Sequence, residues 1–530
     1  MEQLYVGGKI LTMESRANRY EEAVLVENGR IKAVGPEESL KALGKRAERI
    51  RLHGAVAMPA FIDAHSHISG YAFSLLQASV EGAGSFSDIQ ASIRSFIQKN
   101  GIEKGKWVQV KGLDPTILKE KRIPDRHILD AAAPENPVLL QHQSGHTGVF
   151  NTMALKVLGV TADTPVPEGG RIAVENGEPT GYMEENAYMA YLQKLPMPSM
   201  EELERSFQRA QEIYASYGVA TAQDGMVVSM LADIYRHLCA NGKLWLDVVG
   251  YADFREKEAV LQKLRAYTDG YRDHFRLGGY KIFLDGSPQA RTAWMREPYE
   301  GAEDGYCGYP VLKDEAVREY VRSAVSERKQ LLAHCNGDAA ARQYIGAFQN
   351  VLGKDGSAED IRPVMIHAQF LGRDQLADMK KLGMIPSFFI GHVYYWGDSH
   401  IENFGMKRAS CISPSGSALR AGLPFTFHQD SPVTEPDMLE SVWCAVSRRT
   451  KDGELLGGEE RISVLEALKA VTVHGAYQYF EENEKGSIRP GKRADLVILD
   501  RDPLETKQED IRSIRVLETV KDGVPVFGSI

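Results

Sequence analysis

The chain has 530 residues, of which 43% are hydrophobic and 25% charged, and its formal net charge is −9. This length exceeds the usual size of a single hydrophobic core, so we expect two domains. The acidic balance argues against nucleic acid or an anionic membrane as the main partner.

The sequence also lacks the signals of export and membrane insertion. The first residues, Met1 to Tyr5, contain no basic segment followed by an apolar core, as a signal peptide would. No apolar run approaches the roughly 20 residues that are needed to span a bilayer. The five cysteines lie far apart without a Cys-x-x-Cys pair, so we expect reduced thiols. Together these features favour a cytoplasmic protein.

Hairpin-like segments stand at both ends of the chain. Near the start, two apolar runs flank Asn28-Gly29, a pair that tolerates positive φ and is typical of a tight turn. Near the end, two further apolar runs precede Asp522-Gly523. Because isolated hairpins need a sheet to join, we expect residues 1–54 and 485–530 to form one small β-sandwich domain.

Between the ends, short apolar runs alternate with helix-like stretches, which is typical of a parallel α/β arrangement. Eight runs predict a (β/α)₈ TIM-like barrel over residues 55–484. The runs are Ala55–Ile62, Val219–Gln223, Leu244–Tyr251, Gly279–Leu284, Gln330–His334, Pro363–His367, Met384–Phe388 and Pro424–His428. The stretch of about residues 69–200 after the first run must then be an insertion, with strands at Trp107–Gly112 and Val138–His142.

Several histidines and an aspartate stand at the ends of these expected strands. His65 and His67 follow the first strand, and side chains two positions apart on an extended segment lie on the same side. Neutral imidazole is a good ligand for zinc and similar divalent ions. His334, His367 and Asp430 close later strands. Because the C-terminal strand ends of a barrel meet at its mouth, we expect these side chains to converge on a metal.

Three other groups of residues have plainer interpretations. Lys281, inside the fourth strand, would be desolvated towards a neutral amine, or would form a buried salt bridge with Asp285. Cys335 follows His334 on a strand and should point away from any site that His334 faces. The remaining isolated histidines are expected to be packed or surface residues; they are His53, His127, His237, His274, His400 and His474.

An ordered series of motifs runs almost from end to end. It comprises Met58-Pro59-Ala60-Phe61-Ile62-Asp63-Ala64-His65-Ser66-His67, Lys281-Ile282-Phe283-Leu284-Asp285-Gly286-Ser287, His334-Cys335-Asn336-Gly337-Asp338, His428-Gln429-Asp430-Ser431-Pro432-Val433 and Gly491-Lys492-Arg493-Ala494-Asp495-Leu496. This series resembles the metal-dependent amidohydrolase superfamily, and in particular its branch that contains N-substituted formamide deformylases.

The resemblance implies a metal centre with a modified lysine. It implies that one or two divalent ions, with zinc as the expected metal, are bound by His65, His67, Lys281, His334, His367 and Asp430. It also implies that Lys281 is a carbamate, which supplies anionic oxygens where an ammonium would be repelled by the metal. Manganese, cobalt, nickel or iron would also accept mixed imidazole and oxygen ligands.

The same resemblance suggests roles in catalysis and substrate binding. Asp430 is expected to take a proton from metal-activated water and to deliver one to the leaving amine. His392, after the seventh strand, is a candidate for stabilising the oxyanion, with simple packing as the alternative. His428 is a candidate substrate contact or a support for a metal ligand. His146, in the insertion, and Trp396, in an aromatic wall, are further candidate substrate contacts.

The leading interpretation is a hydrolase that cleaves a carbon–nitrogen bond other than a peptide bond in a small molecule such as an N-formyl or N-acyl amine. Hydrolysis of a cyclic amide or ester, or deamination of a ring, stays open because the same metal centre serves all of them. A catalytically silent partner protein would usually lack ligands, whereas all of the ligand positions are filled here. The fold does not fix the substrate, and the oligomeric state, a homo-oligomer included, is also open.

Overall fold

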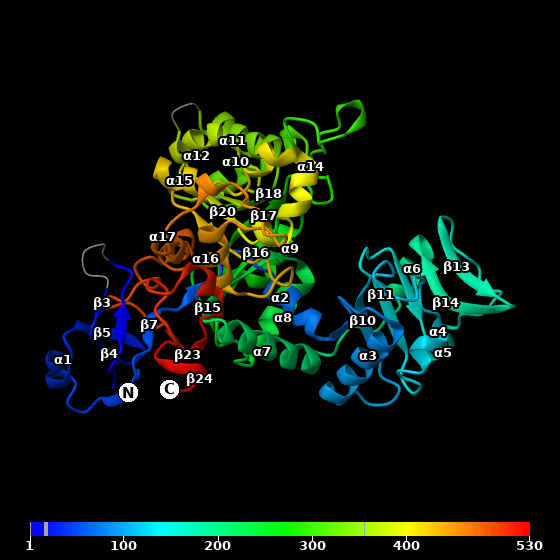
Figure 1. Ribbon diagram of the computed structural model, residues 1–530, viewed down its shortest axis with the longest axis horizontal. Helices are drawn as coiled ribbons and strands as arrows, with labels where there is room; N and C mark the ends of the chain where they lie inside the picture. Colours follow the sequence, from blue (N-terminus) through cyan, green and yellow to red (C-terminus); the bar gives the residue numbers. More distant parts are fainter. Residues whose placement is uncertain (1, 15–19, 354–355) are drawn as a thin grey trace. The chain divides into compact units, whose positions relative to one another are not determined.

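The computed structural model describes residues 2–14, 20–353 and 356–530, which divide into two compact units (Figure 1). One unit comprises the chain up to Tyr71 together with Phe207–Ile530, and the other is Ala72–Ser206. The second unit covers most of the insertion that the sequence predicts at about residues 69–200. None of the helices in the described ranges is both long enough and apolar enough to cross a membrane.

The centre of the first unit is an eight-stranded parallel sheet whose strands follow chain order. Its strands are β8 (Phe61–Ile62), β15 (Val219–Val227), β16 (Asp247–Asp253), β17 (Phe275–Phe283), β18 (Gln330–Cys335), β19 (Val364–His367), β20 (Ile385–Phe388) and β21 (Thr426–Phe427). Beyond the outermost strands, Asp430 N donates to His65 O at 3.2 Å and His67 N donates to Ser431 O at 2.8 Å. The sheet therefore curls round so that its first and last strands meet, as in a TIM-like barrel.

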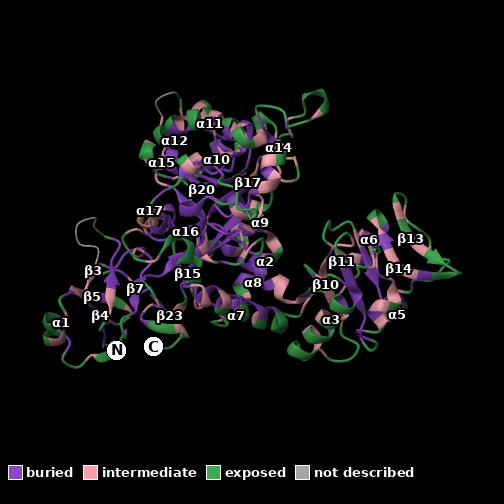
Figure 2. Cartoon of the chain, viewed as in Figure 1, coloured by how far each residue is buried: buried purple, intermediate pink, exposed green. Residues whose placement is uncertain are grey.

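Helices between the strands have a buried face, which is apolar, and an opposite face that is exposed (Figure 2). In α10 (Asp314–Glu327), for example, the buried residues Val317, Val321 and Ala324 recur at helical spacing. The other helices of this unit include α8 (Ser229–Ala240), α9 (Lys257–Leu264), α11 (Asp338–Leu352), α12 (Leu376–Leu382), α13 (His392–Tyr395), α14 (Gly397–Ala409), α15 (Ser415–Ala421), α16 (Met438–Ser447), α17 (Val464–Ala470) and α18 (Val473–Gln478). Short 3₁₀ helices lie at Phe254–Glu256, Arg265–Tyr267, Glu303–Gly305, Arg373–Gln375, Gly458–Glu460 and Gln508–Ser513.

Both chain ends contribute to a pair of smaller sheets. A four-stranded sheet consists of β5 (Arg30–Gly35), β4 (Ala23–Glu27), β1 (Glu2–Val6) and β6 (Glu48–Arg51), with α1 (Glu37–Leu43) beside it. A six-stranded sheet consists of β24 (Val524–Gly528), β23 (Val516–Lys521), β22 (Leu496–Leu499), β7 (Val56–Pro59), β2 (Lys9–Leu11) and β3 (Tyr20–Glu21). One buried cluster includes Tyr5 and Val24 from the first sheet and Ile10 and Ile498 from the second. The two sheets therefore share a hydrophobic core.

The segment that leads into the first barrel strand differs from the prediction. The expected single strand Ala55–Ile62 is divided between β7, in the six-stranded terminal sheet, and β8, in the barrel sheet. Pro59, which has no backbone N–H to donate, is the last residue of β7. Two residues later, Phe61 N donates to Gly218 O, which precedes β15. One continuous segment thus belongs to both sheets.

The second unit has a six-stranded sheet of its own. Its order is β13 (Gly170–Glu175), β14 (Glu178–Glu184), β12 (Thr147–Phe150), β11 (Val138–His142), β10 (Val108–Leu113) and β9 (Gln77–Ser79). The two strands expected in the insertion are therefore present as β10 and β11. The accompanying helices are α3 (Phe86–Asn100), α4 (Arg126–Asp130), α5 (Thr152–Leu158) and α6 (Glu185–Leu192), while α2 (Ile68–Leu75) and α7 (Met200–Ser216) lie where the two units join along the chain.

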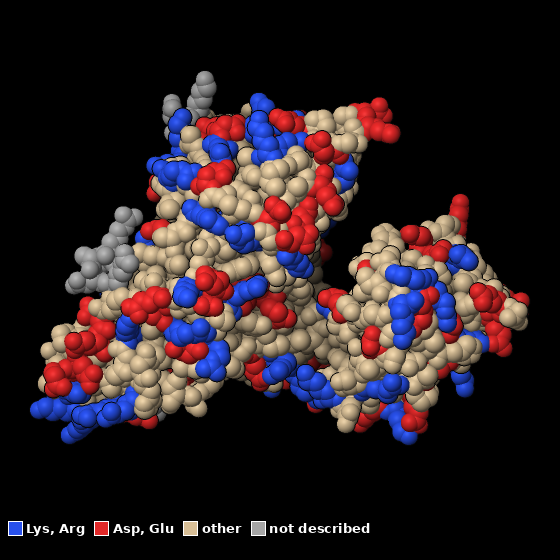
Figure 3. Space-filling model, in the orientation of Figure 1, with Lys and Arg blue, Asp and Glu red and all other residues tan. Residues whose placement is uncertain are grey.

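Charged side chains of both signs are intermingled on the face shown in Figure 3. Ion pairs within one helix include Lys41 with Glu37 at 2.8 Å and Arg318 with Glu315 at 2.7 Å. An exposed ion pair contributes only about 0–1 kcal/mol. Burial of apolar side chains in the sheets is therefore the main source of stability.

Candidate active site

The C-terminal ends of the barrel strands carry the residues that the sequence singled out. His65 and His67 follow β8, and His334 lies near the end of β18. His367 is the last residue of β19, and Asp430 lies just beyond β21. Because parallel strands end on the same side of the sheet, these side chains can approach one another although they are far apart in the sequence.

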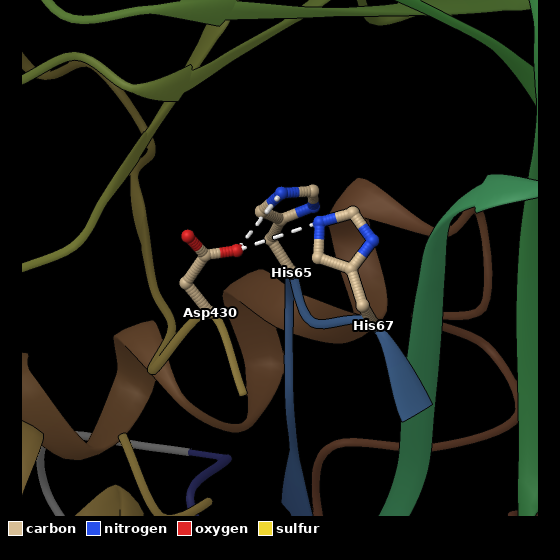
Figure 4. A group of neighbouring side chains, drawn as sticks. All are labelled: His65, His67 and Asp430. Carbon is tan, nitrogen blue, oxygen red and sulfur yellow. Dashed lines mark ion pairs between the residues drawn. The ribbon is translucent and has the colours of Figure 1, made fainter. Parts of the chain in front are cut away.

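Asp430 lies beside both histidines of the first strand end (Figure 4). Its Oδ1 atom is 3.5 Å from Nε2 of His65 and 3.6 Å from Nε2 of His67. This oxygen is buried and has no hydrogen-bond partner in the part of the chain that the structure describes. Ligand atoms about 2.0–2.2 Å from one tetrahedral zinc ion lie about 3.4 Å apart. The spacing and the orphaned oxygen therefore fit a divalent ion shared by the three side chains.

Two more histidines extend this group. Nε2 of His367 is 4.0 Å from Oδ2 of Asp430 and 3.1 Å from Nδ1 of His334. His367 and Asp430 adopt φ angles of 70° and 53°, a region that residues with a side chain rarely occupy. Such a conformation costs about 1–3 kcal/mol and persists only where the surroundings impose it, as they often do at active sites.

Lys281 is buried against the same group. Its Nζ atom lies 3.1 Å from Nε2 of His65, and only 1% of the residue is exposed. Burial lowers the pKa of Lys281 below its ordinary value, although the nearby Asp430 carboxyl opposes this shift. The alternative partner, Asp285, accepts hydrogen bonds from the backbone N–H groups of Asn336 and Gly337 instead. Lys281 thus faces the histidines rather than a salt-bridge partner.

The imidazoles of the group are held in their neutral form. Burial lowers the pKa of His65 well below its ordinary value, and the nearby Lys281 acts in the same direction. The same two causes lower the pKa of His67 to about 3 and that of His334 to about 4. A neutral imidazole offers a lone pair, which is the form that binds a metal.

Gln223, which the sequence analysis placed only at the end of an expected strand, orients His65. Its Oε1 atom lies 2.5 Å from Nδ1 of His65, and its amide nitrogen donates to Ala64 O and to the Tyr479 hydroxyl. A Cβ atom at Gly225 would come within 2.3 Å of the His65 ring, so only glycine leaves room for it. In the sequence, the only sign of this role is that Gln223 is a polar residue at the end of an otherwise largely apolar strand.

His428 is enclosed between two other side chains. Its Nε2 atom is 3.2 Å from Nδ1 of His367, and its Nδ1 atom is 2.9 Å from Oγ of Ser387. The residue is fully buried. With both ring nitrogens engaged inside the protein, this geometry favours a supporting role over direct contact with substrate.

His392 and Trp396 lie close together after β20. Their ring centroids are 4.4 Å apart, and the centroid of Phe389 is 4.8 Å from that of His392. Phe389 also lies 5.5 Å from His428 between ring centroids. This aromatic group therefore borders the cluster of candidate ligands, and the roles of His392 and Trp396 towards substrate stay predictions.

Two further residues lie apart from these contacts. His146 belongs to the second unit, where it is exposed and its Nδ1 lies 3.1 Å from Oε2 of Glu185. Its role in substrate binding stays a prediction. Cys335 is fully buried, and burial raises the pKa of its thiol, whereas 18% of the His334 side chain is exposed. The two neighbours thus differ in exposure as a strand dictates.

The fold and these side chains define the class of protein. A sequence profile described as "Amidohydrolase family" matches residues 48–527. The chain belongs to this family, and the protein is a metal-dependent hydrolase that acts on carbon–nitrogen bonds.

Individual relatives are similar along almost their whole length. The chain is 29% identical to the N-substituted formamide deformylase of Arthrobacter pascens, an alignment that covers 98% of this chain and 97% of the relative. It is 26% identical to the putative amidohydrolase YtcJ of Bacillus subtilis, with 99% of each chain covered. An uncharacterised metal-dependent hydrolase from Pyrococcus horikoshii has a similar fold, with a TM-score of 0.78, 24% identity and coverage of 96% of this chain and 99% of that one.

Proposed function

We propose that the enzyme hydrolyses the amide bond of an N-formyl or N-acyl amine, with zinc as its metal. The observation that carries this proposal is the group of His65, His67 and Asp430, whose donor atoms lie within 4.8 Å of one another. The similarity to a protein named N-substituted formamide deformylase supports the choice of substrate class. The products would be the free amine and the carboxylate, which is formate for a formyl substrate.

The proposed ligands of one or two ions are His65, His67, His334, His367, Asp430 and a carbamate on Lys281. Burial of Lys281 lowers its pKa, which favours the neutral amine. That amine can form a bond to the carbon of carbon dioxide and release a proton, which leaves an anionic carbamate. A divalent ion bound here lowers the pKa of its water towards neutrality and polarises a carbonyl oxygen.

The side chains of this enzyme would then move the protons. Asp430 accepts a proton from the attacking water at its carboxylate and returns one to the nitrogen of the leaving amine. Burial raises the pKa of Asp430 above its ordinary value, so the carboxyl can hold a proton between the two steps. His392 would donate a hydrogen bond to the substrate oxygen as negative charge develops on it.

The two terminal sheets are proposed to form a single β-sandwich domain. Residues 1–54 and 485–530 would form this domain, and residues 55–484 the catalytic barrel with its insertion. The shared cluster that contains Tyr5, Val24, Ile10 and Ile498 supports this division.

A turnover screen tests the proposed substrate. The zinc-loaded and the manganese-loaded protein would each be incubated with N-formyl amines, N-acyl amines, dipeptides, lactams, aryl esters and amino-substituted rings, and the released amine, acid or ammonia quantified. We expect the highest kcat/KM for an N-formyl or N-acyl amine. A higher kcat/KM for a lactam, an ester or a ring amine would replace the proposal by the corresponding alternative.

A further inference from the structure

A second pair of histidines lies outside the candidate metal ligands. His392, in α13, and His400, in α14, approach each other with Nδ1 of His392 3.2 Å from Nε2 of His400. Their rings are within 2° of parallel, and their centroids are 5.4 Å apart. His392 is 5% exposed, and His400 is fully buried. In sequence, His400 is one of the isolated histidines that are expected to be packed or surface residues.

The surroundings of His400 are apolar on its other side. The ring centroid of Phe370 lies 5.6 Å away in an edge-to-face arrangement, and that of Phe404 lies 6.2 Å away. The Nδ1 atom of His400 is buried and, within the described ranges, has no hydrogen-bond partner. The Nε2 atom of His392 also has no partner among the described residues, but it is not one of the fully enclosed atoms. The two free nitrogens are therefore not equivalent.

Both rings are neutral at ordinary pH. Burial lowers the pKa of His400 to about 3, and burial together with the neighbouring His400 lowers the pKa of His392 well below its ordinary value. A neutral imidazole carries one N–H and one bare nitrogen. The hydrogen bond between the rings can therefore have only two forms, with either His400 or His392 as the donor.

The enclosed nitrogen decides between these two forms. If His392 donated from Nδ1, the single hydrogen of His400 would lie on its Nδ1 atom, as a buried N–H with no acceptor. If His400 donates from Nε2, that Nδ1 atom is a bare lone pair, and the free N–H lies on Nε2 of His392, which is not enclosed. Orphaned buried N–H groups are rare, and they are rarer than acceptors that lack a full set of donors. The second form is the more stable.

We propose that His400 is a positioning residue, which donates its Nε2 hydrogen to Nδ1 of His392 and thereby fixes His392 as the tautomer with hydrogen on Nε2. His392 then presents a hydrogen-bond donor, and not a proton acceptor, next to Phe389, whose ring also lies near the candidate ligand His367. This inference rests on the proposed function in one respect, that the group receiving this donor is the oxygen of an amide substrate. The tautomer itself follows from the protein alone.

The position of His392 suits a donor to a developing oxyanion. Phe389 packs against both His392 and His428, with centroid distances of 4.8 Å and 5.5 Å. A donor that is already oriented loses no energy to reorganisation when the charge develops. The opposite tautomer would face the substrate oxygen with a lone pair and would repel it.

The tautomer can be observed without any substrate. Nitrogen-15 spectra of the full-length zinc-loaded enzyme, labelled at histidine, separate the protonated from the bare ring nitrogens. Spectra of His392→Gln and His400→Gln identify the two residues by the signals that disappear. We expect protonated Nε2 and bare Nδ1 for both rings. A proton on Nδ1 of His392 would overturn the inference.

Kinetics of two matched variants test the consequence for catalysis. His400→Gln places an amide nitrogen near the position of Nε2 and keeps a donor, whereas His400→Phe keeps a ring of similar size without one. Loss of one oxyanion donor lowers kcat by about 10²–10³-fold. We therefore expect a fall in kcat of about tenfold or more for His400→Phe with little change in KM, and near-normal kcat for His400→Gln. A near-normal kcat for His400→Phe would show that His400 only fills space and would overturn the positioning role.

A control variant and stability measurements distinguish a loss of folding from a loss of positioning. The combination of the two experiments also distinguishes failure of this inference from failure of the proposed function. His474→Gln alters a half-buried histidine that contacts Phe425 O, and it should leave kcat unchanged. Zinc content and the thermal unfolding midpoint are compared for all variants. If no N-formyl or N-acyl amine is hydrolysed but His392 carries its proton on Nε2, the proposed function fails and the inference stands. If such a substrate is hydrolysed but His392 carries its proton on Nδ1, the inference alone fails.

Discussion

Oε1 of Gln223 accepts the hydrogen on Nδ1 of His65 across 2.5 Å, which leaves the lone pair of His65 on Nε2, 3.1 Å from Nζ of Lys281. That Nε2 atom is the one that lies 3.5 Å from Asp430. The carboxamide is itself held by Ala64 O and by the Tyr479 hydroxyl, so it cannot rotate freely. Gln223 can therefore set the direction of His65, one of the proposed metal ligands, without being a ligand itself.

Replacement of Gln223 by Leu should weaken metal binding. Without the acceptor, His65 can rotate or change tautomer, and loss of such a partner typically costs about 10–100-fold in metal affinity. The affinity is measured by competition between the enzyme and a zinc chelator. Gln343→Leu, which removes a half-buried carboxamide that donates to Leu312 O, is the matched control. Equal affinities in wild type and Gln223→Leu would contradict the orienting role.

Replacement of Asp430 by Asn should abolish proton transfer and largely preserve metal binding. The amide oxygen can still act as a ligand, but the amide cannot accept a proton from water, so kcat should fall by about 10²–10⁴-fold. Turnover and zinc content are measured on the same preparations. In the control Asp437→Asn, the new side chain can still cap α16, as Asp437 does through Glu440 N, and kcat should not change. An active Asp430→Asn enzyme would remove Asp430 from the proposed proton transfer.

Replacement of Lys281 by Met should remove the carbamate and release metal. Met fills a similar volume without an amine, so no carbon dioxide can be bound there, and we expect a clear fall in the number of ions per chain by elemental analysis. Carbon-13 spectra of wild type in labelled bicarbonate should show a carbamate signal that Lys281→Met lacks. The exposed Lys313 provides the control Lys313→Met. Unchanged metal content in Lys281→Met would exclude a metal ligand at this position.

A buried ion pair joins the barrel to the chain's C-terminal segment and should make stability depend on pH. Asp247, in β16, contacts Lys485 and lies 3.2 Å from Lys521 in β23. Burial alone would raise the pKa of Asp247, but the two lysines outweigh it and hold this pKa well below its ordinary value. A carboxyl with a lowered pKa stabilises the folded state above its unfolded pKa of about 4, and this contribution is lost as the pH falls further.

Replacement of Asp247 by Asn should therefore destabilise the enzyme most at neutral pH. Loss of one partner from a buried pair costs about 3–5 kcal/mol, because Lys485 and Lys521 stay buried with less compensation. Urea unfolding midpoints of wild type and variant are compared between pH 7 and pH 3. We expect the difference to narrow below about pH 4, because the carboxyl then takes up a proton when the wild-type chain unfolds but stays ionised in the folded state. A difference that did not change with pH would mean that the charge of Asp247 contributes nothing.

Much of the barrel follows from local sequence patterns. Each of the eight apolar runs overlaps a strand, because a strand buried on both faces is apolar along its length. The run Ala55–Ile62 was the exception, since apolarity does not show that Pro59 ends one strand and that the chain then joins another sheet. Register and sheet membership depend on partners such as Gly218 and Leu496, which lie far away in the sequence.

The site was harder to predict beyond its charged and imidazole groups. His65, His67 and Asp430 could be selected because each follows an apolar run. Gln223 and His400 were harder to select, since each acts through a contact with another side chain, and neither the expected strand end at Gln223 nor the position of His400 shows that contact. His400 in particular is indistinguishable in sequence from a histidine that only fills space.

The position of β7 has a consequence for how the enzyme is made. This strand lies between β2, near the start of the chain, and β22, near its end, and it leads directly to β8 and then to His65 and His67. Domains generally fold during synthesis, starting from the N-terminus. Here the strand that precedes His65 and His67 lacks one neighbour until Leu496–Leu499 has emerged from the ribosome. The sheet that leads into His65 and His67 is therefore complete only after nearly the whole chain has been synthesised.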